Sequence, residues 1–157
     1  MNSDFDIPPQ KINFADDLQF GQKGEKMVQS FLEGLLSNDS YEVKTDRYRN
    51  GRMVVETDQN PFGKKDDAGN PIWVPSGINV TKATWWVYVF TLGEGFIAVD
   101  VQRLKRFLRR FPYKFNPNTK RSLGSAGDNP ARGFLLMPND VIDLLSNSDY
   151  DAPKGEQ

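Results

Sequence analysis

Two acidic residues, Asp46 and Glu56, stand on neighbouring short segments that have the composition of β-strands. Like charges held close together on adjacent strands repel each other unless a positive group lies between them. A divalent cation such as Mg²⁺ or Mn²⁺ is the usual neutralising group, because these ions prefer oxygen ligands. Lys44 lies close to Asp46 in the chain, and a third acid, Glu25, lies upstream in a segment with helical periodicity. This layout predicts a metal-dependent site that cleaves phosphodiester bonds.

The two acidic strands are separated by Asn50-Gly51, a dipeptide that strongly favours a β-hairpin turn. A strict two-residue turn would place Asp46 opposite Val55, and Asp46 and Glu56 would then lie on different faces. A three-residue turn with a bulge, or an irregular stretch over 47–49, would place Asp46 opposite Glu56. We predict this second arrangement, because it brings the two carboxylates together.

The composition excludes several kinds of chemistry. The chain has 157 residues and contains neither cysteine nor histidine. Disulfides, thiolate or imidazole zinc sites and histidine-dependent hydrolysis are therefore excluded. The N-terminus lacks the basic start and apolar segment of a signal peptide, and no long apolar run predicts a membrane span. We expect a cytoplasmic protein.

One segment, residues 101–121, is strongly basic although the net charge of the chain is only −1. It carries eight lysines and arginines and no acid. Because the segment offers its own cations no partner, we expect them to face the phosphates of DNA rather than to be merely solvated. The residues predicted to bind DNA are Arg103, Arg106, Arg109, Arg110, Lys120 and Arg121.

The hydrophobic pattern predicts an α/β fold in which a mixed central β-sheet is flanked by helices. The expected helices span 22–36, 101–111 and 138–145, and the expected strands span 41–48, 52–58, 84–92, 95–100 and 133–137. A long basic loop is expected at 113–132. The predicted organisation is an N-terminal arm at 1–20, a folded domain at 21–146 and a flexible tail at 147–157.

Three pieces of the sequence resemble the motif of the PD-(D/E)xK nuclease superfamily, especially phage-type Holliday-junction resolvases and related phage endonucleases. They are Gly24-Glu25-Lys26-Met27-Val28, then Asp46, then Val54-Val55-Glu56-Thr57. The resemblance implies a restriction-endonuclease-like αβββαβ core and a Mg²⁺- or Mn²⁺-dependent endonuclease that acts on DNA, with branched or junction DNA as a candidate substrate. It also implies that Asp46 and Glu56 are metal-binding catalytic residues and that Glu25 adds to the metal shell.

The chain departs from this family at one position. The family's lysine is expected two residues after Glu56, where Asp58 stands, and strand alternation predicts that Glu56 and Asp58 share one face. Either the lysine has migrated or catalysis has been lost. Such a lysine would orient the attacking water or stabilise charge on the phosphate. In order of preference, the replacements are Lys44 as the catalytic lysine, then Lys82, then Lys64 or Lys65.

Each of these interpretations has a plainer alternative. Asp46 and Glu56 would also suit a solvated sheet edge, and Glu25 would suit a surface position near a helix start. Lys44 would also suit an ion pair with Glu42 or Glu56. Two other functions therefore stay open: a catalytically inactive protein of nuclease fold that binds DNA or inhibits a host, and a virion or assembly protein. DNA is the expected partner, no membrane is expected, and a homodimer is left open.

Overall fold

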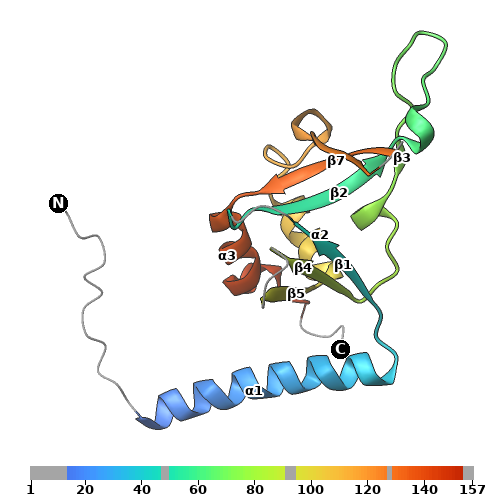
Figure 1. Cartoon of the computed structure of the whole chain (residues 1–157). Coiled ribbons are helices and arrows are strands. Elements are labelled where there is room, and N and C mark those ends of the chain that lie inside the picture. Colours follow the sequence, from blue (N-terminus) through green and yellow to red (C-terminus); the bar gives the residue numbers. More distant parts are fainter. Residues whose placement is uncertain (1–13, 47–49, 91–94, 127–128, 154–157) are drawn as a thin grey trace. The chain divides into compact units, whose positions relative to one another are not determined.

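The computed structural model describes residues 14–46, 50–90, 95–126 and 129–153 (Figure 1). The chain divides into two compact units, residues 1–39 and 40–157, and each is described by itself. The first unit contains one long helix, α1 (Phe14–Ser37). The helix begins well before the predicted 22–36 and so includes part of the expected N-terminal arm.

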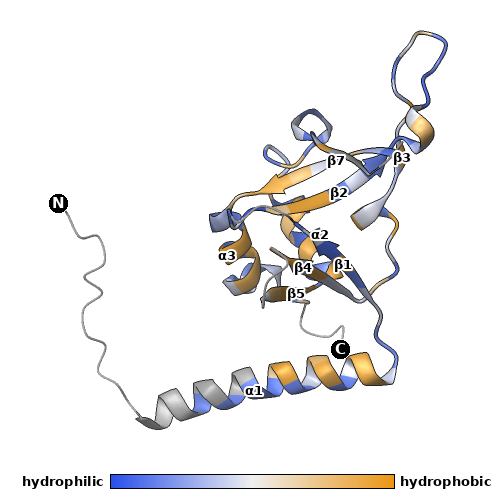
Figure 2. Cartoon of the chain, in the orientation of Figure 1, coloured by the Kyte–Doolittle hydropathy of each residue, from blue (hydrophilic) through white to orange (hydrophobic). Residues whose placement is uncertain are grey.

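Helical periodicity usually marks a face that packs against the core, but the apolar side of α1 is exposed. Leu32 and Leu36 lie one turn apart, and 51% and 88% of their respective surfaces are accessible. Figure 2 shows apolar and polar residues alternating along the described part of this helix. Helical spacing therefore predicted the helix but not the burial of its apolar side.

The second unit divides its strands between two sheets, and its α/β class confirms the predicted fold class (Figure 1). The first sheet has the order β1-β4-β5, with β1 parallel to β4 and β5 antiparallel to it. The second sheet is antiparallel, with the order β3-β2-β7-β6. The strands of the first are β1 (Tyr41–Thr45), β4 (Trp85–Val89) and β5 (Phe96–Asp100). The strands of the second are β2 (Met53–Gln59), β3 (Val74–Pro75), β6 (Arg121–Ala126) and β7 (Asn129–Leu136).

The predicted hairpin across Asn50-Gly51 is wrong, because β1 and β2 belong to different sheets. The backbone N–H of Asp46 donates to the carbonyl of Val89 on β4 at 2.8 Å, and this bond extends the parallel pairing of β1 with β4 by one residue. On β2, Val55 lies opposite Phe134 of β7, and both side chains are buried. Burying this apolar face against a distant strand outweighs the local preference of an Asn-Gly turn.

Two helices complete the second unit, α2 (Val101–Arg110) and α3 (Pro138–Ser146). α2 contacts β5, α3 and a short 3₁₀ turn, η4 (Ser148–Tyr150). Tyr150 lies in the segment expected to be a flexible tail, yet it is buried and its ring packs at 5.1 Å from that of Phe107. The segment expected to be a basic loop contains β6, whose backbone pairs with β7. β6 lacks an apolar alternation that would have predicted it.

Candidate functional site

A cluster of charged side chains lies where β1 meets β2, although these strands belong to different sheets. The Lys44 Nζ lies 2.8 Å from Oε1 of Glu42 and 4.0 Å from Oε2 of Glu56. The same Nζ lies 5.5 Å from the centre of the buried Trp86 ring. We call Glu42, Lys44, Asp46 and Glu56 the acid–lysine cluster. All four side chains are half-buried, so their charges interact more strongly than on an open surface.

Asp46 is fixed by the buried Tyr88 of β4. The Tyr88 hydroxyl donates to Oδ2 of Asp46 at 3.1 Å and accepts from the backbone N–H of Val54 at 3.1 Å. Burial raises the pKa of Tyr88 to about 12, and the Asp46 carboxylate adds to this shift. Tyr88 therefore stays neutral and links β1 to β2. Tyr88 therefore ties Asp46 to Val54 of β2. Two residues further along β2, Glu56 is approached by Lys44.

Glu42 is an acid that the sequence argument did not place in the site. Burial works to raise the pKa of Glu42, but the hydrogen bonds from Lys44 and Thr81 outweigh burial and hold that pKa below its usual value. Glu42 is therefore ionised at neutral pH. Lys44 makes both contacts named by the plainer alternative, one with Glu42 and one with Glu56. Its position alone therefore agrees with an ion pair as well as with a catalytic lysine.

Two glycines allow other parts of the chain to pack directly against the backbone at Glu56. A Cβ on Gly77, whose φ is +49°, would lie 2.3 Å from the carbonyl oxygen of Glu56. A Cβ on Gly133 of β7 would lie 2.1 Å from the carbonyl oxygen of Val55 and 2.8 Å from Cα of Glu56. Glycine inside a strand is a known sign of close backbone approach. Gly133 therefore carried a signal that the sequence analysis did not use.

The prediction that Glu56 and Asp58 share a face is wrong. The register of β2 shifts between them, so that Glu56 lies opposite Gly133 while Asp58 lies opposite Arg132. This bulge reverses the alternation of side chains along the strand. Asp58 is 8% exposed, and its Oδ2 lies 2.5 Å from Nζ of Lys120 and 3.1 Å from Nε of Arg132. Burial works to raise the pKa of Asp58, but hydrogen bonds led by the one from Lys120 outweigh it and keep that pKa low.

Of the candidate lysines, Lys44 is the one that the structure places beside Glu56. Lys82 is exposed on the segment before β4. Lys64 lies over the ring of Phe62 at 5.9 Å, and Lys65 is exposed in the same loop. Among the described residues, the ion-pair geometry therefore favours Lys44 over the other three lysines as the partner of Glu56.

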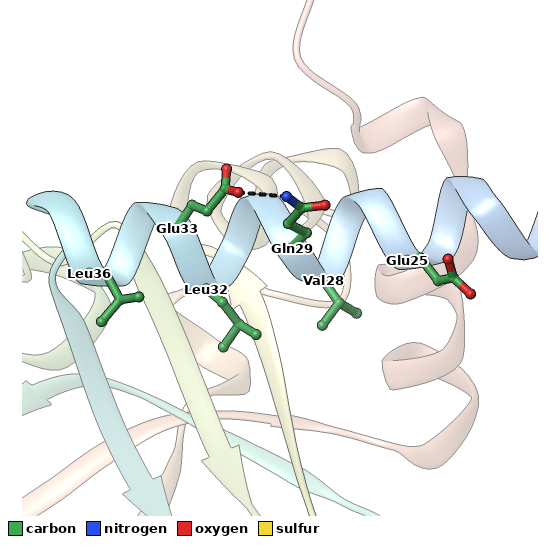
Figure 3. A pocket seen from close by; sticks show the side chains of 6 residues that line it. All are labelled: Glu25, Val28, Gln29, Leu32, Glu33 and Leu36. Atoms are coloured by element: carbon green, nitrogen blue, oxygen red, sulfur yellow. Dashed lines mark hydrogen bonds between the residues drawn. The ribbon is translucent and has the colours of Figure 1, made fainter.

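Glu25 lies on α1, in the first unit. Figure 3 shows Glu25 on the helix with Val28, Leu32 and Leu36, and these residues line a groove of about 480 Å³. Glu33 on the same helix accepts a hydrogen bond from Gln29 at 2.7 Å. The role of Glu25 in a metal shell stays a prediction, since the two units are described separately.

The donors of the acid–lysine cluster fit a magnesium ion in type. Within the described ranges, no group of three or more histidine, cysteine or acidic side chains is arranged to hold a metal ion. Mg²⁺ nevertheless often binds through only one or two carboxylates, together with waters and substrate phosphates. Asp46 and Glu56 supply carboxylate oxygens of this kind.

The prediction that the cations of the basic segment lack internal partners is wrong for Lys114, which forms an ion pair with Asp140, and for three of the residues predicted to bind DNA. Arg103 forms an ion pair with Asp151 and donates to a carbonyl at the end of α3 at 2.7 Å. Arg106 donates to the carbonyl of Tyr150 at 2.7 Å, and Lys120 forms an ion pair with Asp58 of β2. Their partners come from distant parts of the chain, so an acid-free segment does not imply unpaired cations.

The other three predicted DNA-binding residues are Arg109, Arg110 and Arg121, and all three are exposed. Arg109 and Arg110 lie in the last turn of α2, and Arg121 begins β6. Their contact with DNA phosphates stays a prediction.

Comparisons with known proteins give no match to a family model, a curated protein or a solved structure. Membership of the PD-(D/E)xK superfamily therefore stays a prediction that rests on the motif residues. In the part of the chain that the structure describes, no helix has the length and apolar character needed to cross a membrane.

Proposed function

We propose that the protein is a Mg²⁺- or Mn²⁺-dependent DNA endonuclease whose catalytic residues are Asp46, Glu56 and Lys44. One observation carries this proposal: Lys44 lies 4.0 Å from Glu56, beside Asp46, although β1 and β2 belong to different sheets. Lys44 and Glu56 meet from separate elements, and together with Asp46 they supply the carboxylates and the cation that metal-assisted phosphodiester hydrolysis uses.

Each residue of the cluster has a role in this proposal. Asp46 and Glu56 would hold the metal ion, and a bound ion would supply a water molecule of lowered pKa and positive charge to offset that of the phosphate. Tyr88 holds Asp46 in position through its hydroxyl. The Lys44 ammonium stabilises the negative charge that grows on the phosphate oxygens. The water oxygen forms a new bond to phosphorus and its proton passes to solvent, while the P–O bond to the sugar breaks and the leaving sugar oxygen takes up a proton from solvent.

The motif resemblance suggests branched or junction DNA as the substrate, and the cysteine-free composition fits action in the cytoplasm. A second candidate function is a protein that binds DNA without cutting it. The ion pairs favour this candidate, because Lys44 already faces two carboxylates at 2.8 and 4.0 Å and so has its charge satisfied. In that case the acid–lysine cluster only joins β1 to β2.

A cleavage assay separates the two functions. Purified protein is incubated with Mg²⁺ or Mn²⁺ and with linear, nicked and four-way DNA. The wild type is expected to cut at least one of these, and Asp46→Asn and Glu56→Gln are expected to lower the rate by about a hundredfold or more. Lys44→Ala is expected to lose turnover but to keep the rise in melting temperature that Mg²⁺ produces. The matched control is Asp67→Asn, which removes the charge of an exposed loop acid.

The contrary outcomes are equally specific. Unchanged cleavage in both Asp46→Asn and Glu56→Gln would show that the acid–lysine cluster is not the catalytic site. Loss of activity in Lys82→Ala but not in Lys44→Ala would overturn the lysine assignment. DNA binding by a wild type that cuts none of the substrates would support the second candidate.

A further inference from the structure

A groove of about 630 Å³ lies on the second unit, and its lining shares no residue with the acid–lysine cluster. It is formed by the start of β2, the segment after α2, β6 and the end of β7. A site of this size matches those that hold small ligands or parts of larger ones. Its lining includes Arg52, Tyr113, Lys114, Arg121, Leu135 and Met137.

The groove is positively charged. Its lining contains three cations, Arg52, Lys114 and Arg121, and no acid. Lys114 is neutralised by an ion pair with Asp140. Arg52 and Arg121 are exposed, and neither guanidinium has an ion-pair partner within the residues that the structure describes. Two unpaired guanidinium groups beside one groove suit an anion, and phosphate in particular, because arginine binds it through two parallel hydrogen bonds.

The groove also presents an aromatic ring. Tyr113 is 75% exposed, and the ring of Phe111 packs nearly perpendicular to it, with their centres 6.0 Å apart. The buried Phe115 and Phe134 also line the groove, and Met137 adds exposed apolar surface. An exposed aromatic ring beside unpaired arginines is the combination that holds single-stranded nucleic acid, where bases stack on rings and cations track the backbone.

We infer that this groove binds unpaired nucleotides, with Arg52 and Arg121 on phosphates and Tyr113 stacked on a base. The inference rests on the proposed function in taking nucleic acid as the ligand, and it adds the class of nucleic acid that is recognised. The bases of an intact duplex are stacked on each other and do not offer their faces to Tyr113. Single strands, ends and branch points do offer them.

Fluorescence anisotropy with a labelled thymidine oligonucleotide of about 20 nucleotides tests the inference, since one such groove spans several nucleotides. The buffer contains EDTA, so the measurement does not depend on cleavage. A duplex of the same length is measured in parallel. The variants are Tyr113→Ala, Tyr113→Phe and the double variant Arg52→Ala with Arg121→Ala. The matched controls are Tyr41→Ala and Lys26→Ala, which remove an exposed tyrosine and an exposed cation outside the groove.

Tyr113→Ala is expected to weaken single-strand binding by about fivefold or more, while Tyr113→Phe keeps the ring and the affinity. The double arginine variant is expected to reduce the salt dependence of log affinity by roughly 0.7 per lost phosphate contact. The two controls are expected to bind like the wild type. Thermal unfolding of each variant shows that the fold is retained.

Several results would overturn the inference. Equal affinity for duplex and single strand, or an unchanged affinity in Tyr113→Ala, would show that no base stacks in the groove. Competition by poly-glutamate that depends on the arginines but not on Tyr113 would assign the groove to an acidic peptide. If the groove variants lose single-strand binding while Asp46→Asn and Glu56→Gln still cleave DNA, the proposed catalytic site is wrong and the nucleotide-binding groove is supported. If wild-type protein cuts duplex DNA but does not bind the oligonucleotide, the groove fails alone.

Discussion

Tyr88→Phe is the substitution that tests most directly how the acid–lysine cluster is assembled. It removes one oxygen atom and leaves the ring, which is 2% exposed, in the core. That oxygen donates to Asp46 and accepts from the backbone N–H of Val54, both at 3.1 Å. The substitution therefore cuts both hydrogen bonds that join β1, β2 and β4 at this point, with almost no change in packing.

The expected cost follows from the groups left behind. A partly buried donor or acceptor that loses its partner costs about 1–3 kcal/mol. Val54 and Asp46 are both half-buried, so water can partly replace the hydroxyl, and we expect the free energy of unfolding to fall by about 1–3 kcal/mol in total. For a protein of this size, that corresponds to a melting temperature lower by roughly 3–10 °C.

Urea unfolding of both proteins at neutral pH measures this difference. A second measurement uses alkaline pH. The pKa of Tyr88 is raised from 10.0 to about 12, so its stabilising contribution is complete below pH 10.0 and is lost as the pH rises through about 12. The wild type is therefore expected to lose stability faster than Tyr88→Phe over this range. Tyr150, whose pKa is also raised to about 12, is present in both proteins and cancels in the comparison.

Asp46→Asn is the matched control, because its amide oxygen can still accept the hydrogen bond from Tyr88. Its stability is expected to stay within about 0.5 kcal/mol of the wild type. An unfolding free energy of Tyr88→Phe that also stays within about 0.5 kcal/mol of the wild type would refute the reasoning. The Tyr88 hydroxyl would then not hold β1 against β2.

Two further predictions concern the surroundings of Glu56. Asp58→Asn is expected to cost about 2–3 kcal/mol at pH 7, because two cations lose a partly buried partner. The pKa of Asp58 in the folded protein is below its usual 3.8, so its contribution to stability is fully present above pH 3.8. As the pH falls through the folded-state pKa, the difference in unfolding free energy between variant and wild type narrows. Urea unfolding at several pH values measures this difference. Gly77→Ala is expected to cost about 2 kcal/mol or more, because its φ is +49° and the new Cβ meets backbone at 2.3 Å. The control is Gly63→Ala, because φ of Gly63 is +61° and an added Cβ would meet no atom within 4 Å, so that this variant measures the backbone strain alone. Equal melting temperatures for the two variants would contradict a steric role for Gly77.

Alternation and helical spacing predicted most elements of the second unit but not their partners. On β1 the alternation of side chains is legible in the sequence, but its sense is reversed, because Tyr41 and Val43 are exposed while Glu42 and Lys44 are half-buried. Nothing in that pattern states that the strand pairs with residues 85–89 in parallel rather than with the next strand in antiparallel. Pairing depends on which apolar faces can be buried together, and that is decided by contacts far apart in the chain.

The charged residues divide in the same way. The plainer alternative paired Lys44 with Glu42 or Glu56, and both contacts are present, but Glu56 comes from a strand of another sheet rather than from across a hairpin. Arg103 was predicted to face DNA because its own segment has no acid, yet it is paired with Asp151. A local count of charges cannot reveal a partner supplied by a distant turn. The exposed Tyr113 was read only as part of a loop, because a groove exists only after the chain has folded.

The bulge in β2 explains why an acid stands where the resemblance calls for a lysine. Past the bulge, position 58 lies opposite Arg132 and reaches Lys120, so a lysine there would face two cations in a buried setting. Repulsion at such distances would be severe, and an acid is the residue type that fits. Under the proposed function, the cation beside Glu56 comes from another strand, and Lys44 of β1 lies 4.0 Å from it. By this argument Asp58→Lys would not recreate the missing motif but would disrupt the packing of β2 against β6 and β7.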